Sequence, residues 1–290
     1  MGRRAALRSR HRAGVLGVWG HAAGGRAQVE AAVHDHAQPR LDVHHGPAEL
    51  VARRVVRVVP AGDLALSVEF TEEISVETNT RVRALEYLLQ QKGVPGIVET
   101  VPGYRALLVY YDPSVIGYEP LSETLLGLAA QTDATVLPPP RHVAIPCCYE
   151  DPELGFDLAG AAERLGLPPA EVVRAHTAFE HLVYFIGFVP GLPYMDSPER
   201  LTIKRLDTPR TKTPPGSVSI GGAQCCIYPV DSPGGFWVLG RTPLKLYDPA
   251  AAEPVLLRAG DRVRFRAIDR TEFDRIAAAV EARTYRAAIS

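Results

Sequence analysis

The sequence predicts an α+β protein with two domains, the first of ferredoxin-like type and the second a β-rich barrel or sandwich. The chain has 290 residues, which suffices for two domains with apolar cores. Apolar segments between residues 55 and 137 follow the order β-α-β-β-α. From residue 182 to 265, short apolar runs alternate with Gly and Pro, which favours many short strands joined by turns.

Composition limits the classes of function and the compartment. The net charge of −1 gives no support to a nucleic-acid partner. No apolar run approaches the roughly 18–20 residues of a membrane helix, so we expect no membrane contact. The four cysteines form two adjacent pairs, Cys147-Cys148 and Cys225-Cys226, without Cys-x-x-Cys spacing. We predict reduced, buried thiols in a cytoplasmic protein and no metal, with a metal site across the two pairs as the alternative.

The first 54 residues differ in composition from the rest. They are rich in Ala, Gly, Arg and His and have no sustained apolar period. We predict a disordered extension, which a start codon placed too far upstream would explain. The Arg-rich, acid-poor beginning also fits a transit peptide. A metal-binding tract is a further alternative, with the candidate ligands His34, His36, His44 and His45.

The first domain is predicted to cover residues 55–137. Ser75 is placed to cap a helix, and Gly93 is placed to end it. The expected elements are strands at 55–59 and 64–70, a helix at 75–92, strands at 97–101 and 106–111, and a helix at about 120–131. Three consecutive prolines at 138–140 predict a stiff linker.

The second domain is predicted to cover residues 141–268, followed by a C-terminal helix within residues 269–290. The expected elements are a strand at 142–148, helices at 158–165 and 168–176, a closing hairpin at 255–265 and a last helix at 270–283. Between residues 185 and 243, Gly and Pro recur beside aromatic residues. Such a run specifies an unusual backbone path, which indicates a binding site, although a domain with many turns is the alternative.

No self-sufficient catalytic or nucleotide-binding motif is present. The chain lacks a P-loop, a Gly-x-Gly-x-x-Gly turn, a Gly-x-Ser-x-Gly elbow and a His-Glu-x-x-His pair. ATP binding within this chain alone therefore has no motif to support it.

The candidate catalytic residues lie near this Gly- and Pro-rich stretch. His176 ends a predicted helix, where it could act as a general acid or base, oriented by Glu180, or interact with the helix C-terminus. Arg210 and Arg241 lie beside prolines and could grip a carboxylate or bind loop carbonyls. Gln224 could bind a lactam carbonyl or lock a turn.

Glycines and aromatic residues of the same stretch are candidate binding residues. Gly216, Gly234 and Gly235 allow close approach of a ligand or of another strand. Tyr194 could line a pocket or pack in the core.

Linked motifs in this order resemble one known family. The matching segments are Pro60-Ala-Gly-Asp63, Phe188-Val-Pro-Gly-Leu-Pro-Tyr194, Thr208-Pro-Arg210, Pro215-Gly-Ser-Val-Ser-Ile-Gly-Gly222, Gln224, Ile227-Tyr-Pro229, Ser232-Pro-Gly-Gly235, Gly240-Arg-Thr-Pro243 and Ala259-Gly-Asp-Arg-Val-Arg-Phe265. Residues from about 55 to 268 resemble the family of 5-oxoprolinase B subunits, also called the Kip-inhibitor or allophanate-hydrolase-subunit-1 family. The same module is similar to part of the carboxyltransferase region, subdomains C and D, of urea carboxylases.

The resemblance implies a cyclophilin-like barrel and obligate partners, the C and A subunits of 5-oxoprolinase. Together such complexes are expected to open 5-oxo-L-proline to L-glutamate with hydrolysis of ATP, which is bound with the partner subunits. On this basis we expect His176 to move protons, Arg210 or Arg241 to hold the substrate carboxylate, and Gln224 to fix the amide. The expected substrate-binding residues are Gly191, Tyr194, Gly216, Ser217, Gly222, Ser232, Gly234, Gly235 and Thr242.

The chain departs from the family pattern at two places. Cys225-Cys226 stands where Thr-Gly is expected, and Leu192 replaces a usual Phe. Two other functions remain open. One is a module that binds and inhibits a histidine kinase, and the other is a carboxyltransferase component of a urea- or allophanate-processing system.

Overall fold

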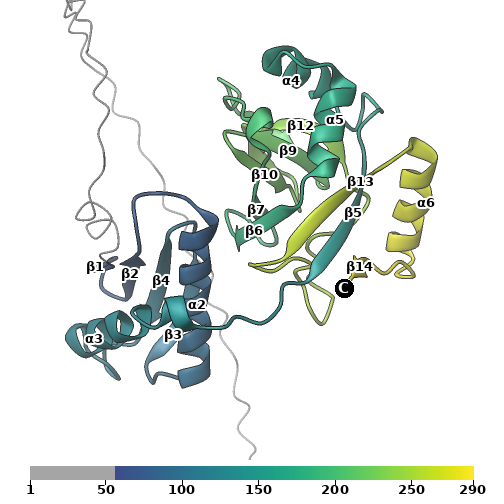
Figure 1. Cartoon of the computed structure of the whole chain (residues 1–290). Helices are drawn as coiled ribbons and strands as arrows, with labels where there is room; N and C mark the ends of the chain where they lie inside the picture. The colour runs from purple at the N-terminus through teal and green to yellow at the C-terminus, as the bar shows by residue number, and fades with distance from the viewer. Residues whose placement is uncertain (1–55) are drawn as a thin grey trace, which may run out of the picture. The chain divides into compact units, whose positions relative to one another are not determined.

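The computed structural model describes residues 56–290 (Figure 1), so the predictions for residues 1–54 and their histidines lie outside the described residues. The helices are α2 (Val76–Lys92), α3 (Tyr118–Ala129), α4 (Leu158–Leu165), α5 (Pro169–Ala178) and α6 (Arg270–Glu281). The strands are β1 (Arg57–Pro60), β2 (Ala65–Glu69), β3 (Ile97–Pro102), β4 (Ala106–Tyr111), β5 (His142–Cys148), β6 (His181–Ile186), β7 (Pro193–Asp196), β8 (Arg210–Thr213), β9 (Ser217–Gly221), β10 (Gln224–Ile227), β11 (Ser232–Gly234), β12 (Trp237–Arg241), β13 (Arg262–Ile268) and β14 (Ala288–Ile289).

The N-terminal half is a four-stranded antiparallel sheet with two helices, α2 and α3. The predicted signals at the ends of α2 are confirmed. Ser75 Oγ accepts a hydrogen bond from the Thr78 backbone N–H at 3.0 Å, and Gly93 ends the helix with a positive φ of 56°. The apolar faces of sheet and helices meet in a core that includes Leu66, Leu85 and Leu121.

The strand order of this sheet is β1-β2-β4-β3. A ferredoxin-like chain runs β-α-β-β-α-β, and the elements from β2 to α3 supply the first five of these in order. In the described residues the sheet gains no strand after α3, and β1 pairs with the free edge of β2 instead. The ferredoxin-like classification of this half therefore stays a prediction.

The C-terminal half contains a closed barrel of seven strands, which confirms the predicted barrel. The order around it is β12-β9-β10-β7-β6-β13-β5, and β12 pairs again with β5 where Arg241 faces Cys148. The pairing of β13 with β5 is parallel, while the other pairings in the barrel are antiparallel. β14 extends the sheet beside β5, and β8 pairs with β11 in a separate ribbon.

The predicted closing hairpin at 255–265 is wrong. Only its second half is a strand, and β13 lies beside β5 in parallel rather than folding back on residues 255–259. Val255 instead forms an isolated bridge with Tyr247, and the Leu256 backbone N–H donates to Leu246 at 3.0 Å. Gly260, with φ of 92°, turns the chain between the two segments.

The helices of this half begin and end close to the predicted residues. Gly166 ends α4 in the left-handed conformation with φ of 66°, and Pro169 is the first residue of α5. Asp269 caps α6 by accepting from the Glu272 backbone N–H at 2.7 Å. α4 packs on α5 and β12, α5 on β13, and α6 on β5.

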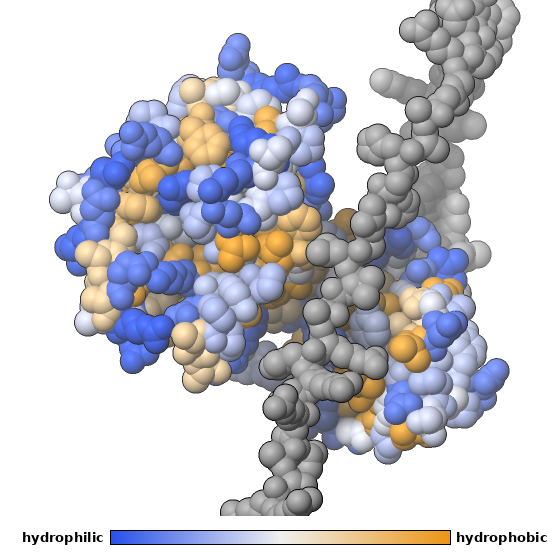
Figure 2. Space-filling model, turned by 180° about the vertical axis from the view of Figure 1, so that it is seen from behind, coloured by the Kyte–Doolittle hydropathy of each residue, from blue (hydrophilic) through white to orange (hydrophobic). Residues whose placement is uncertain are grey.

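Both halves show a mainly hydrophilic surface in Figure 2, interrupted by hydrophobic patches. Phe188, in the loop between β6 and β7, is one of the large apolar side chains that remain exposed, at 63%. No described helix has the length and apolar character needed to cross a membrane.

Candidate functional site

A pocket of about 380 Å³ opens within the Gly- and Pro-rich part of the C-terminal half. Its walls combine aromatic rings, one guanidinium and glycine backbone. The lining includes Phe188, Tyr194, Arg205, Tyr228, Gly234 and Phe236. Pockets with mostly apolar walls and a few polar groups are typical sites for small molecules.

Gly234 makes room for the Tyr228 hydroxyl. A Cβ atom at this position would collide with the Tyr228 hydroxyl and lie 2.9 Å from Thr213 Oγ1. Burial raises the pKa of Tyr228, and a hydrogen bond from the Phe236 backbone only partly opposes it. Tyr228 therefore keeps its proton near neutral pH and can donate a hydrogen bond.

Gly191 does not line the pocket, but it belongs to the β6–β7 loop that carries the pocket residues Phe188 and Leu192. Its φ is 82°, and a Cβ there would lie 2.9 Å from Tyr247 Cβ and 3.1 Å from the Leu246 carbonyl oxygen. Phe188, three residues earlier, also has a positive φ, of 70°. This conformation is strained for a residue with a side chain, and such strain is common at ligand sites.

Arg205 is the charged group of the pocket. Its Nη2 donates to Gln224 Oε1 at 2.8 Å, and its guanidinium lies 4.6 Å from the centre of the Phe236 ring. Within residues 56–290, no carboxylate lies within ion-pair distance of Arg205. A guanidinium held by a ring and an amide, but without an acidic partner, is suited to bind a carboxylate or phosphate.

Three of the predicted binding residues, Tyr194, Gly234 and Gly235, line this pocket. Gln224 contacts it through Arg205. Sequence reasoning missed Arg205, Phe188 and Tyr228 as pocket residues, although the last two lie within the quoted motifs.

The expectation that His176 faces the loops at the barrel mouth is wrong. His176 is fully buried on the inner face of α5, one helical turn after the buried Val172. Its Nδ1 lies 2.9 Å from the Tyr149 hydroxyl, and its Nε2 lies 3.4 Å from Cys225 Sγ. Burial, and then the neighbouring His181, hold the pKa of His176 well below its ordinary value.

Glu180 does not orient His176. Its Oε1 lies 3.2 Å from His142 Nδ1 and 3.9 Å from Arg264 Nη2 on the surface. The expected acid–base pair of His176 and Glu180 is therefore not formed.

The two candidate arginines have different surroundings. Arg210 donates to Asp157 and, at 3.2 Å, to the Phe236 carbonyl. The second contact agrees with the alternative in which Arg210 binds a loop carbonyl instead of a substrate carboxylate. Arg241 is half-buried, and its Nε has no hydrogen-bond partner among the described residues. Burial lowers the pKa of Arg241, and the charge of Asp231 partly opposes this.

Most of the other predicted binding residues hold the barrel together. A Cβ on Gly216 would collide with the Thr242 carbonyl, so Gly216 permits close approach of another strand rather than of a ligand. Thr242 Oγ1 accepts from the Leu244 backbone N–H, and Ser232 Oγ donates to the Val230 carbonyl. Gly222 turns the chain between β9 and β10 with φ of 65°, and Ser217 is buried with no partner for its hydroxyl in the described chain.

Comparison with known proteins agrees with this architecture. Residues 56–257 match the family described as carboxyltransferase domain, subdomain C and D, so the chain is a protein of that class. A solved structure of the K. lactis urea amidolyase superposes with a TM-score of 0.67 at 22% identity, covering 81% of this chain and 16% of that one. At this identity the likeness shows the fold.

Two curated relatives define the family more closely. The B subunit of 5-oxoprolinase from Bacillus subtilis (strain 168) is 35% identical over 223 residues, which cover 73% of this chain and 92% of that protein. Its counterpart, the 5-oxoprolinase B subunit from Escherichia coli O157:H7, is 37% identical over 206 residues, covering 70% and 92%. The chain belongs to the family of 5-oxoprolinase B subunits.

Proposed function

We propose that this chain is the B subunit of a cytoplasmic 5-oxoprolinase complex, which hydrolyses 5-oxo-L-proline to L-glutamate together with its A and C subunits. Family membership supports the reaction. The single structural observation behind the proposal is Arg205, a guanidinium without an acidic partner among the described residues, in an aromatic pocket. In this proposal Arg205 binds the carboxylate of the substrate.

The reaction needs an activated lactam. ATP would phosphorylate the lactam oxygen, releasing ADP, and water would then attack the lactam carbonyl carbon. The carbon–nitrogen bond breaks and the nitrogen takes a proton, which leaves an acyl phosphate. A second water hydrolyses this acyl phosphate and releases phosphate and the new carboxylate of glutamate. Since this chain has no nucleotide-binding motif, a partner chain would supply the ATP site.

The pocket residues would have separate roles. Arg205 would bind the substrate carboxylate, with Gln224 and the Phe236 ring holding the guanidinium in place. The Tyr228 hydroxyl could donate to the lactam oxygen. His176 does not transfer protons at this pocket in our proposal. It is buried, and its two ring nitrogens contact Tyr149 and Cys225 in the core.

Co-expression with the A and C subunits and an assay of ATP-dependent glutamate release tests the proposal. Arg205→Ala should raise KM for 5-oxo-L-proline by about 10–100-fold, the loss of one charge-assisted hydrogen bond. Lys204→Ala is the matched control, since Lys204 is the exposed neighbour and pairs with Asp207. An unchanged KM in Arg205→Ala would remove this pocket from the proposal, and full activity of the chain alone would refute the shared site.

A carboxyltransferase role is the second candidate, because the matching family model is a carboxyltransferase domain. The chain has neither a biotin-attachment motif nor a biotin-carboxylase domain, so this role would also need other chains. Turnover that depends on biotin would favour it over the hydrolase.

A kinase-inhibiting module is the third candidate. The exposed Phe188 ring at the pocket edge could contact a partner protein. Lack of inhibition of kinase autophosphorylation at micromolar concentration would eliminate it.

A further inference from the structure

Three side chains of the kind that bind metal ions converge inside the barrel. His176 comes from α5, His181 from β6 and Cys225 from β10. Their ligand atoms all lie within 4.8 Å of one another, and all three residues are buried. Two imidazoles and one thiolate form a donor set that suits zinc and similar ions.

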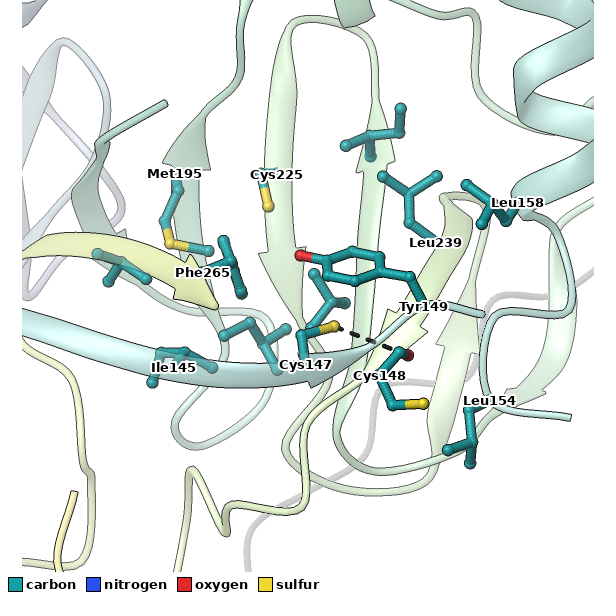
Figure 3. Packing of buried hydrophobic residues seen from close by; sticks show 14 of the residues in the cluster. Ile145, Cys147, Cys148, Tyr149, Leu154, Leu158, Met195, Cys225, Leu239 and Phe265 are labelled. Carbon is teal, nitrogen blue, oxygen red and sulfur yellow. Dashed lines mark hydrogen bonds between the residues drawn. The ribbon is translucent and has the colours of Figure 1, made fainter. Parts of the chain in front are cut away.

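The pair of His176 and Cys225 already has the spacing of two ligands on one ion. His176 Nε2 lies 3.4 Å from Cys225 Sγ. On a tetrahedral zinc ion, a nitrogen at about 2.0 Å and a sulfur at about 2.3 Å lie roughly 3.5 Å apart. His176 Nδ1 lies 2.9 Å from the Tyr149 hydroxyl, which points toward Cys225 in Figure 3. A hydrogen bond from Nδ1 to this hydroxyl would leave Nε2 free to bind an ion, as metal-binding histidines require.

His181 has a ring nitrogen that lacks a donor. Its Nδ1 lies 2.8 Å from the Asp196 carbonyl oxygen, and its Nε2 lies 3.1 Å from the His176 carbonyl oxygen. A neutral imidazole has a single N–H, so it can donate to only one of the two carbonyls. The other ring nitrogen of a neutral His181 therefore directs its lone pair at a carbonyl oxygen. A bound cation would relieve this contact between two acceptors.

Cys225 can also offset part of the charge of an ion. Binding would release the Cys225 thiol proton to solvent, and the resulting thiolate offsets one of two positive charges. Asp196 is paired with Gln224, the residue before Cys225, and its carboxylate accepts from the Leu182 backbone N–H at 2.6 Å.

We propose that His176, His181 and Cys225 form an internal site for a zinc-class divalent ion. The ion would join α5, β6 and β10 and would stabilise the barrel. Because all three ligands are buried, it would enter while the chain folds. The site is separate from the pocket of Arg205 and does not depend on the proposed function.

Expression of the full chain in medium supplemented with zinc, or separately with cobalt, tests this site. Elemental mass spectrometry should find about one zinc per chain after dialysis. The cobalt form should show the intense visible bands of tetrahedral cobalt and a thiolate-to-cobalt band in the near ultraviolet. Cys225→Ser should lose the thiolate band and at least tenfold of the metal content.

Cys226→Ser is the matched control. Cys226 is the next residue of β10, but its side chain packs with Leu192, Tyr228 and Phe236 beside the pocket. This variant should keep both the metal and the thiolate band. Circular dichroism establishes that each variant is folded, and His181→Gln provides a second ligand variant if Cys225→Ser does not fold.

Two results would overturn the proposal. One is wild-type protein with far less than one equivalent of metal from both media. The other is metal content and spectra that are the same in wild type and in a folded Cys225→Ser or His181→Gln variant.

Discussion

Arg210 of β8 donates to Oδ1 of Asp157, while Oδ2 of the same carboxylate accepts from the Val238 backbone N–H at 2.8 Å. Asp157 precedes α4 but makes no side-chain cap to that helix. Its carboxylate therefore joins β8 to β12. Burial raises the pKa of Asp157, and the hydrogen bond from Val238 and the charge of Arg210 partly oppose this.

Asp157→Ala should lower the free energy of unfolding by about 2–3 kcal/mol, because it leaves Arg210 and the Val238 N–H without their acceptor. Chemical denaturation measures the change. Asp231→Ala is the control, since Asp231 pairs with the exposed Lys212 of the same β8 strand, and its loss should cost less than about 1 kcal/mol.

The same pair tests the catalytic role predicted for Arg210. If Arg210 is structural, Arg210→Ala should lower stability without changing KM for the substrate of the assembled complex. A raised KM in a variant of normal stability would restore the prediction that Arg210 holds the substrate carboxylate.

Gly234 and Gly127 give opposite predictions for the same substitution. Gly234→Ala should lower stability by about 1–3 kcal/mol and weaken binding at the pocket, because the new Cβ displaces the Tyr228 hydroxyl. Gly127 lies exposed within α3 with nothing within 4 Å of a Cβ, so Gly127→Ala should raise stability by up to about 1 kcal/mol. Thermal unfolding of both variants measures the contrast, and equal effects would contradict the close packing at Gly234.

Glu86 makes the stability of the N-terminal half depend on pH. Burial raises the pKa of Glu86 above its ordinary value of 4.5, more than the hydrogen bond from Thr100 and the charge of Arg83 lower it. The folded chain therefore holds this proton more tightly than the unfolded chain. The resulting stability is fully present below the unfolded pKa and is lost as the pH rises through the folded pKa.

Glu86→Gln removes the buried charge and keeps an acceptor for the Thr100 hydroxyl, which donates to Glu86 at 3.0 Å. We expect the free energy of unfolding at pH 7 to rise by less than about 1 kcal/mol, and the gain to shrink toward pH 4. Glu99→Gln, at an exposed position of β3, should have no comparable effect. A loss of stability at pH 7 in Glu86→Gln would show that the ionised form is favoured instead.

The sequence predicted the elements whose signals are local. The helix from Ser75 to Gly93 has its cap, its apolar face and its terminating glycine within one segment, and the structure confirms it. The hairpin at 255–265 failed because its second half pairs with β5, far away in the sequence, and its first half bridges to Tyr247 instead of folding onto β13. No local sequence pattern predicts the pairing of β13 with β5 or the bridge from Val255 to Tyr247.

The site was less predictable for the same reason. Arg205 belongs to the pocket only because the Phe236 ring, from a distant part of the sequence, lies beneath it. The burial of His176 did have a local signal, since Val172 precedes it by one helical turn on the apolar face of α5. The meeting of His176 with Cys225 depends on the closure of the barrel, and therefore only the structure shows it.

Phe188 combines backbone strain with an exposed ring at the edge of the pocket. Its φ of 70° lies in the left-handed region of backbone conformation. In this region a residue with a side chain is destabilised by roughly 1–2 kcal/mol of conformational energy relative to glycine. Phe188→Gly should therefore raise the free energy of unfolding by about 1 kcal/mol. If the ring contacts the substrate or a partner protein, the same variant should weaken activity of the assembled complex.

Phe188→Ala separates these two effects. Alanine keeps the Cβ atom and therefore the strain, but lacks the ring. We expect Phe188→Ala to match Phe188→Gly in activity and to match the wild type in stability. Thermal unfolding and glutamate release measure the two quantities. Equal stability of the glycine and alanine variants would show that the loop relaxes without strain, and unchanged activity in both would remove Phe188 from the site.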